Sequence, residues 1–140
     1  NIARIREWTD LPILVKGVVR ADEATDLVEA GVDGIVVSNH GGRQIDNSVA
    51  ALDALPEVVE AVGDRVTVLF DSGVRRVAVA LALGAKAVLL GRPWVYGLAL
   101  DGAAGVEHVL RATLAELQIT AELMGKDAAD LDASDVTRRP

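Results

Sequence analysis

The sequence has no cysteine, few aromatic residues and more acidic than basic side chains. Without cysteine, disulfides and thiolate chemistry are excluded. Aromatic residues make up 3% of the chain and apolar residues 51%, so a core must be built from Val, Leu, Ile and Ala. The formal net charge of −7 argues against a general nucleic-acid or anionic-membrane binder, because no basic stripe offsets the acidic surface.

Long apolar runs and targeting segments are also missing. No uninterrupted apolar stretch approaches the roughly 18 residues of a transmembrane helix, and no signal peptide is recognisable. We therefore expect a cytoplasmic protein without a membrane segment. The chain has only two histidines, His40 and His108, which lie far apart in sequence. No metal site is expected, and His108 is predicted to be a surface residue.

Short apolar runs alternate with amphipathic segments along the 140 residues, which indicates one domain or part of a larger one. Buried strands are predicted at 13–18, 34–39, 66–71 and 86–90. Helices are predicted at 22–30, 48–62, 77–83 and 102–124, with a helix end at 1–10, a segment at 94–100 and a polar tail at 126–140.

Two further features of the helices follow from the sequence. Pro56 lies inside the segment 48–62, where it predicts a kink or two shorter helices. The segment 102–124 is amphipathic, and its expected inner face consists of Val106, Val109, Leu110, Leu114, Leu117 and Leu123.

The alternation of strands and helices predicts an α/β fold with a parallel sheet and right-handed crossovers. Four such units leave two arrangements open, a small doubly wound sheet or half of an eight-stranded barrel. The helix-to-strand links at 30–34 and 83–86 are short and contain glycine, which is typical of barrels. We therefore favour half of a (β/α)₈ TIM barrel, with four βα units and a long final helix.

Every predicted strand ends in polar or glycine-rich residues, and parallel strands bring such ends to one face. The endings are Lys16–Gly17, Ser38–His40, Asp71–Gly73 and Gly91–Arg92. Lys16 interrupts an apolar run, and a buried lysine must be paired or must face a ligand. The alternative is a lysine whose ammonium reaches solvent at the strand end.

His40 and Arg43 lie in the stretch Ser-Asn-His-Gly-Gly-Arg-Gln (38–44). An arginine can hold a carboxylate in a bidentate manner while a nearby histidine takes a proton from the neighbouring carbon or hydroxyl. The alternative is a hydrogen-bonded surface histidine beside a solvated loop arginine.

A second group of residues resembles a phosphate site. Glycine loops offer backbone N–H groups, and Arg75 and Arg92 offer positive charge for an anion. The alternative is ordinary turn glycines, Gly73 and Gly91, beside surface arginines.

Four stretches together resemble the FMN-dependent α-hydroxy-acid oxidases and dehydrogenases, which include glycolate oxidase, lactate oxidase and lactate monooxygenase. They are Leu-Pro-Ile-Leu-Val-Lys-Gly-Val (11–18), Gly-Ile-Val-Val-Ser-Asn-His-Gly-Gly-Arg-Gln (34–44), Asp-Ser-Gly-Val-Arg (71–75) and Leu-Leu-Gly-Arg-Pro (89–93). The stretch 91–100 is most similar to the lactate oxidase and monooxygenase branch. The resemblance covers nearly the whole chain and implies the C-terminal half of a (β/α)₈ barrel.

The resemblance also implies roles for single residues. Lys16 would stabilise the reduced flavin ring, and Ser38 would contact the flavin. His40 would be the base that takes a proton from a 2-hydroxy acid, and Arg43 would bind its carboxylate. The ribityl chain and phosphate would be held by Asp71, Ser72, Gly73, Val74, Arg75, Gly91 and Arg92.

The implied activity is the FMN-dependent oxidation of a lactate-like L-2-hydroxy acid to the 2-oxo acid, with O₂ or another electron acceptor. The partner would be a second copy in a homo-oligomer or an N-terminal half-barrel. Two alternatives stay open: an inactive half-barrel that binds phosphate or FMN and needs its N-terminal half, and a phosphate-binding isomerase or synthase.

One departure from the family lies after Arg76, where the chain is about three residues short and the crossover is near its minimum length of about a dozen residues. The missing residues include a Gly and an Asp that the family places before the next helix. The departure therefore affects the helix start beside the expected phosphate site.

Overall fold

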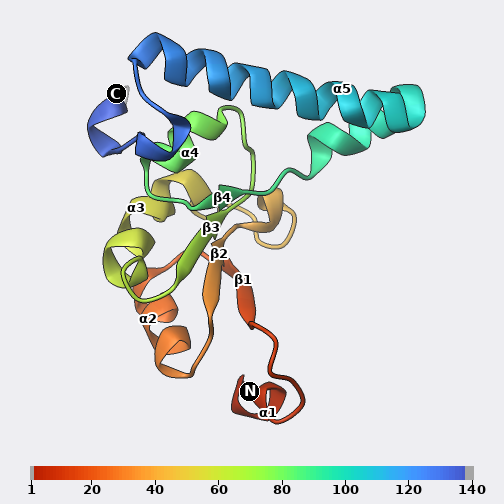
Figure 1. Cartoon of the computed structure of the whole chain (residues 1–140). Helices are drawn as coiled ribbons and strands as arrows, with labels where there is room; N and C mark the ends of the chain where they lie inside the picture. The colour runs from red at the N-terminus through yellow and green to blue at the C-terminus, as the bar shows by residue number, and fades with distance from the viewer. Residues whose placement is uncertain (1, 138–140) are drawn as a thin grey trace.

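The computed structural model describes residues 2–137. Its chain alternates between strands and helices as the sequence predicts (Figure 1). The elements are α1 (Ile2–Arg6), β1 (Leu14–Val18), α2 (Ala21–Glu29), β2 (Gly34–Val37), η1 (His40–Gly42), α3 (Ala51–Val62), β3 (Thr67–Phe70), α4 (Val77–Ala82), β4 (Ala87–Val88), α5 (Arg92–Met124), η2 (Ala128–Asp130) and η3 (Ala133–Asp135).

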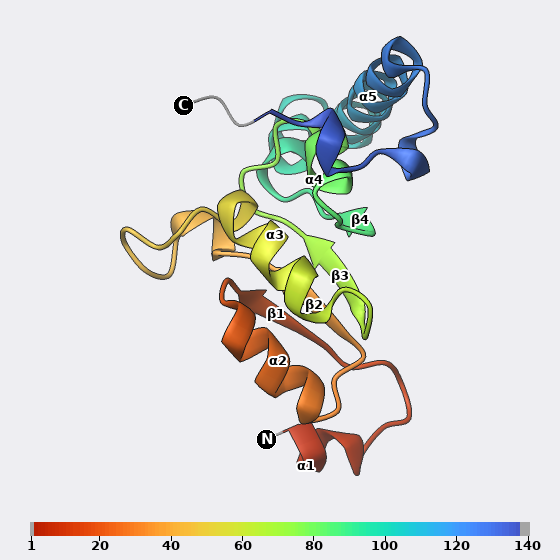
Figure 2. The ribbon, with the colours of Figure 1, turned by 90° about the vertical axis from the view of Figure 1, so that its left-hand side faces the viewer.

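The four strands form one parallel sheet in the order β1-β2-β3-β4. Helices α2, α3 and α4 lie on the same face of this sheet, as the two views at right angles show (Figures 1 and 2). A doubly wound sheet changes direction at a switch point and carries helices on both faces. Sequential strands with helices on one face are instead the arrangement of a barrel segment, so the predicted α/β half-barrel is confirmed.

The core lies between the sheet and the helices that cover it. Its fully buried side chains alternate along the strands and meet apolar positions of the helices. The strands contribute Val18, Ile35, Val37, Val68 and Phe70, and the helices contribute Ala24, Leu55, Val58, Val62 and Ala80. The intervening row, with Lys16 in register with Val36 and Val36 with Leu69, faces the other side of the sheet.

Strand β1 is less buried than its apolar sequence predicts. Val18 is buried, but Leu14 is 44% exposed and the Lys16 side chain is 41% exposed. The prediction of a buried strand with a buried lysine is therefore wrong in part. The physical reason is its position, because β1 is an edge strand of the sheet. Its run of apolar residues is typical of a strand with neighbours on both sides, but here only β2 lies beside it.

Helix α3 is continuous through Pro56, so the predicted kink or division is wrong. The helix also begins at Ala51, three residues after the predicted start at residue 48. Proline removes one backbone hydrogen bond. Leu55 and Val58, on either side of Pro56, are completely buried against the sheet, and this packing keeps the segment helical.

Helix α5 consists of two helical parts that meet at Asp101 and Gly102, whose backbone angles are not helical. The two parts cross where Gly97 approaches Gly105. A Cβ atom built on Gly97 would lie 2.5 Å from the carbonyl oxygen of Gly105, so only glycine permits this approach. The break confirms the predicted separation of 94–100 from 102–124, and it fixes the direction in which the first part leaves β4.

The predicted inner face of the long helix is wrong at three positions. Leu110, Leu114 and Leu123 are 44%, 64% and 84% exposed. The second part of α5 extends beyond the sheet (Figure 1), whereas Leu117, also expected on the inner face, packs on the small cluster formed with α4. Amphipathic periodicity identified the helix but not which side of it meets the four-stranded sheet.

The segment after α5 returns to α4. Leu131 is 8% exposed and packs against Ala78 and Ala82. The Lys126 ammonium pairs with Asp132 at 2.9 Å and with Asp135 at 2.7 Å, which fixes the turn. Of the expected tail 126–140, residues 138–140 lie outside the described part. Within residues 2–137, no helix combines the length and apolarity needed to span a membrane.

Candidate active site

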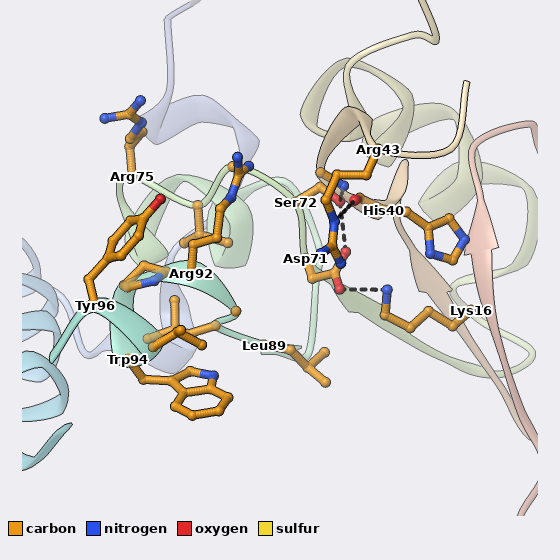
Figure 3. A pocket seen from close by; sticks show the side chains of 17 residues that line it. Lys16, His40, Arg43, Asp71, Ser72, Arg75, Leu89, Arg92, Trp94 and Tyr96 are labelled. Atoms are coloured by element: carbon orange, nitrogen blue, oxygen red, sulfur yellow. Dashed lines mark hydrogen bonds and ion pairs between the residues drawn. The ribbon is translucent and has the colours of Figure 1, made fainter. Parts of the chain in front are cut away.

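The carboxyl ends of the strands and the loops that follow them surround one pocket of about 750 Å³ (Figure 3). All of the sequence-predicted site residues except Ser38 line it. They are Lys16, His40, Arg43, Asp71, Ser72, Gly73, Val74, Arg75, Gly91 and Arg92. Ser38 is completely buried and lies beneath this lining, where it contacts Lys16.

A hydrogen-bond network joins the ends of β1, β2 and β3. The Lys16 ammonium lies 2.8 Å from Oδ2 of Asp71 and donates to Oγ of Ser38 at 2.9 Å. The Ser72 hydroxyl donates to Oδ1 of Asp71 at 2.8 Å. The paired Lys16 therefore has a defined place at the pocket edge although its side chain is partly exposed.

The charge of Asp71 is set by two opposing effects. Burial raises the pKa of its carboxyl group, but hydrogen bonds from Lys16, Ser38 and Ser72, together with the Lys16 charge, outweigh burial. The net result is a pKa below the ordinary value of 3.8. Asp71 is thus an ionised acceptor at neutral pH, and it holds the Lys16 cation and the Ser72 hydroxyl in place.

The loop that carries His40 is fixed through its backbone. The Ser38 hydroxyl accepts a hydrogen bond from the His40 N–H at 3.1 Å. The Ser72 hydroxyl accepts from the N–H groups of Asn39 at 3.2 Å and Gly41 at 3.1 Å. Two serines from the ends of β2 and β3 therefore define the short turn η1 in which the histidine lies.

Two of these loop residues adopt a left-handed backbone conformation that is rare for residues other than glycine. His40 has φ of 56° and Ser72 has φ of 79°. Such left-handed positions in non-glycine residues cost of order 1–3 kcal/mol and persist where the surroundings impose them. The hydrogen bonds of the Ser72 hydroxyl are the interactions that offset this cost.

Three arginines line the pocket without an acidic partner. Arg43, Arg75 and Arg92 form no ion pair with any carboxylate in the described part of the chain. Arg43 Nε donates to the His40 carbonyl at 3.3 Å, which keeps it beside the histidine. Unpaired guanidinium groups in one pocket are suited to anionic ligands such as carboxylate and phosphate.

The side chains of the pocket that can carry positive charge or accept a proton lie in two groups. Arg75 and Arg92 lie on one side, and Lys16 and His40 lie on the other, with Asp71 and Ser72 between them (Figure 3). Arg92 is also the first residue of α5, whose N-terminus adds partial positive charge at the arginine side. The Arg92 guanidinium also reaches the His40 loop, since its Nη2 atom lies 3.1 Å from the position that a Cβ atom on Gly41 would take, so the two groups meet in one pocket.

The shortened connection after Arg76 gives α4 a start without a side-chain cap. Arg76 has extended backbone angles and its guanidinium pairs with Glu116 of α5 at 2.8 Å. Both α4 and α5 begin near the arginines of the pocket. Because α4 has only six residues, α5 has the stronger helix dipole and contributes more positive charge at its N-terminus.

The sequence interpretation missed the apolar wall of the pocket. Leu89, Trp94, Val95 and Tyr96 line the space beside Arg92. Their signal was present, since Trp94 and Tyr96 belong to a chain with only 3% aromatic residues and follow directly after Gly-Arg-Pro. Among residues 2–137 no group of three or more His, Cys, Asp or Glu side chains is placed to hold a metal ion.

Comparison with known proteins identifies the family. Residues 1–138 match the family model of the FMN-dependent dehydrogenases. An FMN-dependent alpha-hydroxy acid dehydrogenase of Schizosaccharomyces pombe is 56% identical over 86% of this chain and 30% of its own length. An L-lactate oxidase of Lactobacillus jensenii is 50% identical over 97% of this chain and 34% of its own. The chain thus spans about a third of the length of these relatives.

The fold comparison agrees. The crystal structure of a monotopic membrane protein, (S)-mandelate dehydrogenase, superimposes with a TM-score of 0.93 at 38% identity. The superposition covers 99% of this chain and 38% of the dehydrogenase. The resemblance inferred from the four sequence stretches is therefore confirmed.

The residues of the pocket fit the FMN that gives this family its name. Arg75, Arg92 and the start of α5 suit its phosphate, and Lys16 suits the electron-rich edge of its ring. The volume lies in the range of roughly 300–1,000 Å³ that is usual for cofactor sites. With these donors and with the match over residues 1–138, the chain belongs to the family of FMN-dependent dehydrogenases.

Proposed function

We propose that the protein containing this chain oxidises a lactate-like L-2-hydroxy acid to the 2-oxo acid, with His40 as the base and Arg43 as the carboxylate clamp. The observation that supports this most is the meeting of these two residues at one pocket. His40 and Arg43 lie in the loop after β2 and Lys16 belongs to β1, yet all three line it. Arg43 has no acidic partner within residues 2–137 and is available to a carboxylate.

Each residue has one task in this proposal. Arg43 binds the substrate carboxylate with two parallel hydrogen bonds, and this orients the adjacent carbon that carries the hydroxyl. The His40 imidazole takes a proton from the 2-hydroxy acid. FMN, when bound, would take up the two electrons and the second hydrogen that the 2-hydroxy acid loses, with O₂ or another oxidant as the final electron acceptor. Lys16 places a positive charge where negative charge develops.

The chain itself is, in this proposal, the C-terminal half of the barrel, with residues 1–140 as one unit. An N-terminal half supplies the opposite wall of the pocket and covers the open edges β1 and β4. The half-barrel without activity is the second candidate, but it leaves the unpaired Arg43 beside His40 without a role. Homo-oligomerisation and a cytoplasmic location are further parts of the proposal.

The decisive experiment replaces His40 in the full-length protein. His40→Gln should lower turnover of the 2-hydroxy acid by roughly 10²–10⁴-fold, the usual contribution of a general base. The flavin absorbance of the purified protein should stay, because the cofactor contacts come from other residues. His108→Gln is the matched control, since His108 is exposed on α5 and does not line the pocket.

Two results would contradict the proposal. Unchanged turnover in His40→Gln would remove the histidine from the reaction. A flavin that is not bleached by any 2-hydroxy acid under anaerobic conditions would support the non-redox half-barrel instead.

A further inference from the structure

Gly17 lies at the carboxyl end of β1, between Lys16 and the buried Val18. Its φ is 105°, and the pairing register with β2 shifts here, so the strand contains a bulge. A bulge re-aims the side chains beside it and is common next to active sites. Gly17 itself is absent from the pocket lining.

The imidazole of His40 lies directly on the Cα atom of Gly17. A Cβ atom built on Gly17 would lie 2.5 Å from Nε2, 3.3 Å from Cε1 and 3.4 Å from Cδ2 of that ring. All three nearest atoms belong to His40, so the space above Gly17 is filled by this one side chain. A separation of 2.5 Å is far below van der Waals contact, and the ring would have to move.

No hydrogen bond orients this imidazole within residues 2–137. The hydrogen bonds of His40 in this part of the chain involve only its backbone N–H and carbonyl groups. The position of the ring is therefore set by packing, and Gly17 is the surface on which it packs. The same bulge that gives Gly17 its left-handed backbone separates Lys16 from Val18.

We propose that Gly17 is a positioning residue for His40: its bare Cα and left-handed backbone form the support that places the imidazole at the reacting position. This inference rests on the proposed role of His40 as the base. It assigns a function to a residue that does not line the pocket, and it gives a role to the bulge that follows the pocket residue Lys16.

The chain contains a matched control for the backbone effect. Gly31, in the turn before β2, has φ of 93°, and a Cβ atom there would meet nothing within 4 Å. Alanine at Gly31 and alanine at Gly17 therefore share the left-handed strain of a non-glycine residue. Only the alanine at Gly17 adds a collision with the imidazole.

The first test measures turnover of the full-length flavoprotein. Gly17→Ala should lower kcat roughly 10- to 100-fold relative to Gly31→Ala, because a displaced base transfers the proton poorly. KM should change much less, since Arg43 remains in place, and flavin absorbance should be retained. Equal kcat values for Gly17→Ala and Gly31→Ala would overturn the proposal.

The second test measures thermal stability and does not depend on activity. A His40→Ala background removes the three atoms nearest to the added Cβ at position 17, so Gly17→Ala should lower Tm there by no more than Gly31→Ala does. In the wild-type background its Tm loss should be larger. The same Tm loss in both backgrounds would show that Gly17 does not act through the ring, and would overturn the proposal.

These tests separate the two levels of inference. Full turnover in the His40→Ala variant would remove the base from the proposed function, while the Tm difference would still report the contact with Gly17. A missing Tm difference with a large kcat loss in His40→Ala would leave the base in place and overturn only the role of Gly17.

Discussion

The two ends of the sheet use backbone strain differently. In the part of the chain that the structure describes, the non-glycine residues with positive φ are His40, Asn47 and Ser72, and all lie in loops that follow β2 or β3. At the opposite end, the turns before β2 and β4 place glycine, Gly31 and Gly84, at the left-handed positions. Strain is thus concentrated where the pocket lies.

The difference teaches how the two ends are held together. At the amino end, Arg6 donates hydrogen bonds to the Gly31 carbonyl at 3.0 Å and to the Asp33 carboxylate at 2.6 Å. These contacts form a staple between α1 and the turn before β2, and they leave the Arg6 guanidinium paired within the chain. At the carboxyl end, Arg43, Arg75 and Arg92 have no carboxylate partner within residues 2–137. One end is completed by the chain itself, and the other end is left for a ligand.

The largest expected difference between the two ends comes from replacing one arginine at each end by lysine. Arg43→Lys should raise KM for the 2-hydroxy acid roughly 10- to 100-fold, because loss of one charge-assisted hydrogen bond costs about 1.5–3 kcal/mol. Arg6→Lys should lower Tm and leave KM unchanged, since it affects only the staple. Steady-state kinetics of both variants test this, and a KM effect of equal size in both would contradict it.

A middle-sized effect is expected at Ser72, where strain and hydrogen bonds meet. Ser72→Gly relieves the left-handed backbone but removes the hydroxyl that accepts from Asn39 and Gly41. Ser72→Ala removes the hydroxyl and keeps the strain. Turnover should fall in both variants by up to about tenfold, which corresponds to 1.4 kcal/mol.

Stability should separate these two variants where turnover does not. Ser72→Gly should have the larger free energy of unfolding, by about 1–2 kcal/mol, because the left-handed strain is relieved. Its Tm should therefore be higher than that of Ser72→Ala. If the glycine variant were both as stable as wild type and as active, the hydroxyl would have no part in holding the His40 loop. Paired melting curves and kcat values decide this.

The smallest effect concerns acid. The pKa of Asp71 in the folded protein lies below 3.8, so the ionised carboxylate stabilises the fold above that pH. The contribution is lost as the pH falls through the lowered pKa, because the unfolded state then binds the proton more readily. Tm measured from pH 5 downward should therefore fall less steeply in Asp71→Asn than in wild type. Parallel slopes would contradict this.

Local patterns in the sequence predicted the order of the elements and the residues at the strand ends. Lys16, Ser38, Asp71 and Gly91 follow apolar runs, and parallel strands bring such endings together whatever their distance in sequence. The pocket lining could be predicted for this reason. Family resemblance then added roles that the pattern alone left open.

What could not be predicted depends on contacts between distant residues. Pro56 predicts a break in the helix, but the complete burial of Leu55 and Val58 against the sheet keeps the segment helical. The helical pattern places Leu110 in the core, but α5 extends beyond the sheet and the side chain is exposed. The contact of Gly17 with His40 joins strand β1 to the loop after β2, and a bulge leaves no periodic trace in a strand of five residues.

The apolar wall of the pocket has an optical consequence. The chain has two tryptophans: Trp94 lines the pocket, and Trp8 follows α1, 70% exposed and at the other end of the molecule (Figure 1). A flavin bound in the pocket accepts excitation energy from a neighbouring indole, so Trp94 emission is expected to be quenched while Trp8 stays bright. A Trp8→Phe variant would leave Trp94 as the one indole among these 140 residues, so that its emission could report cofactor binding.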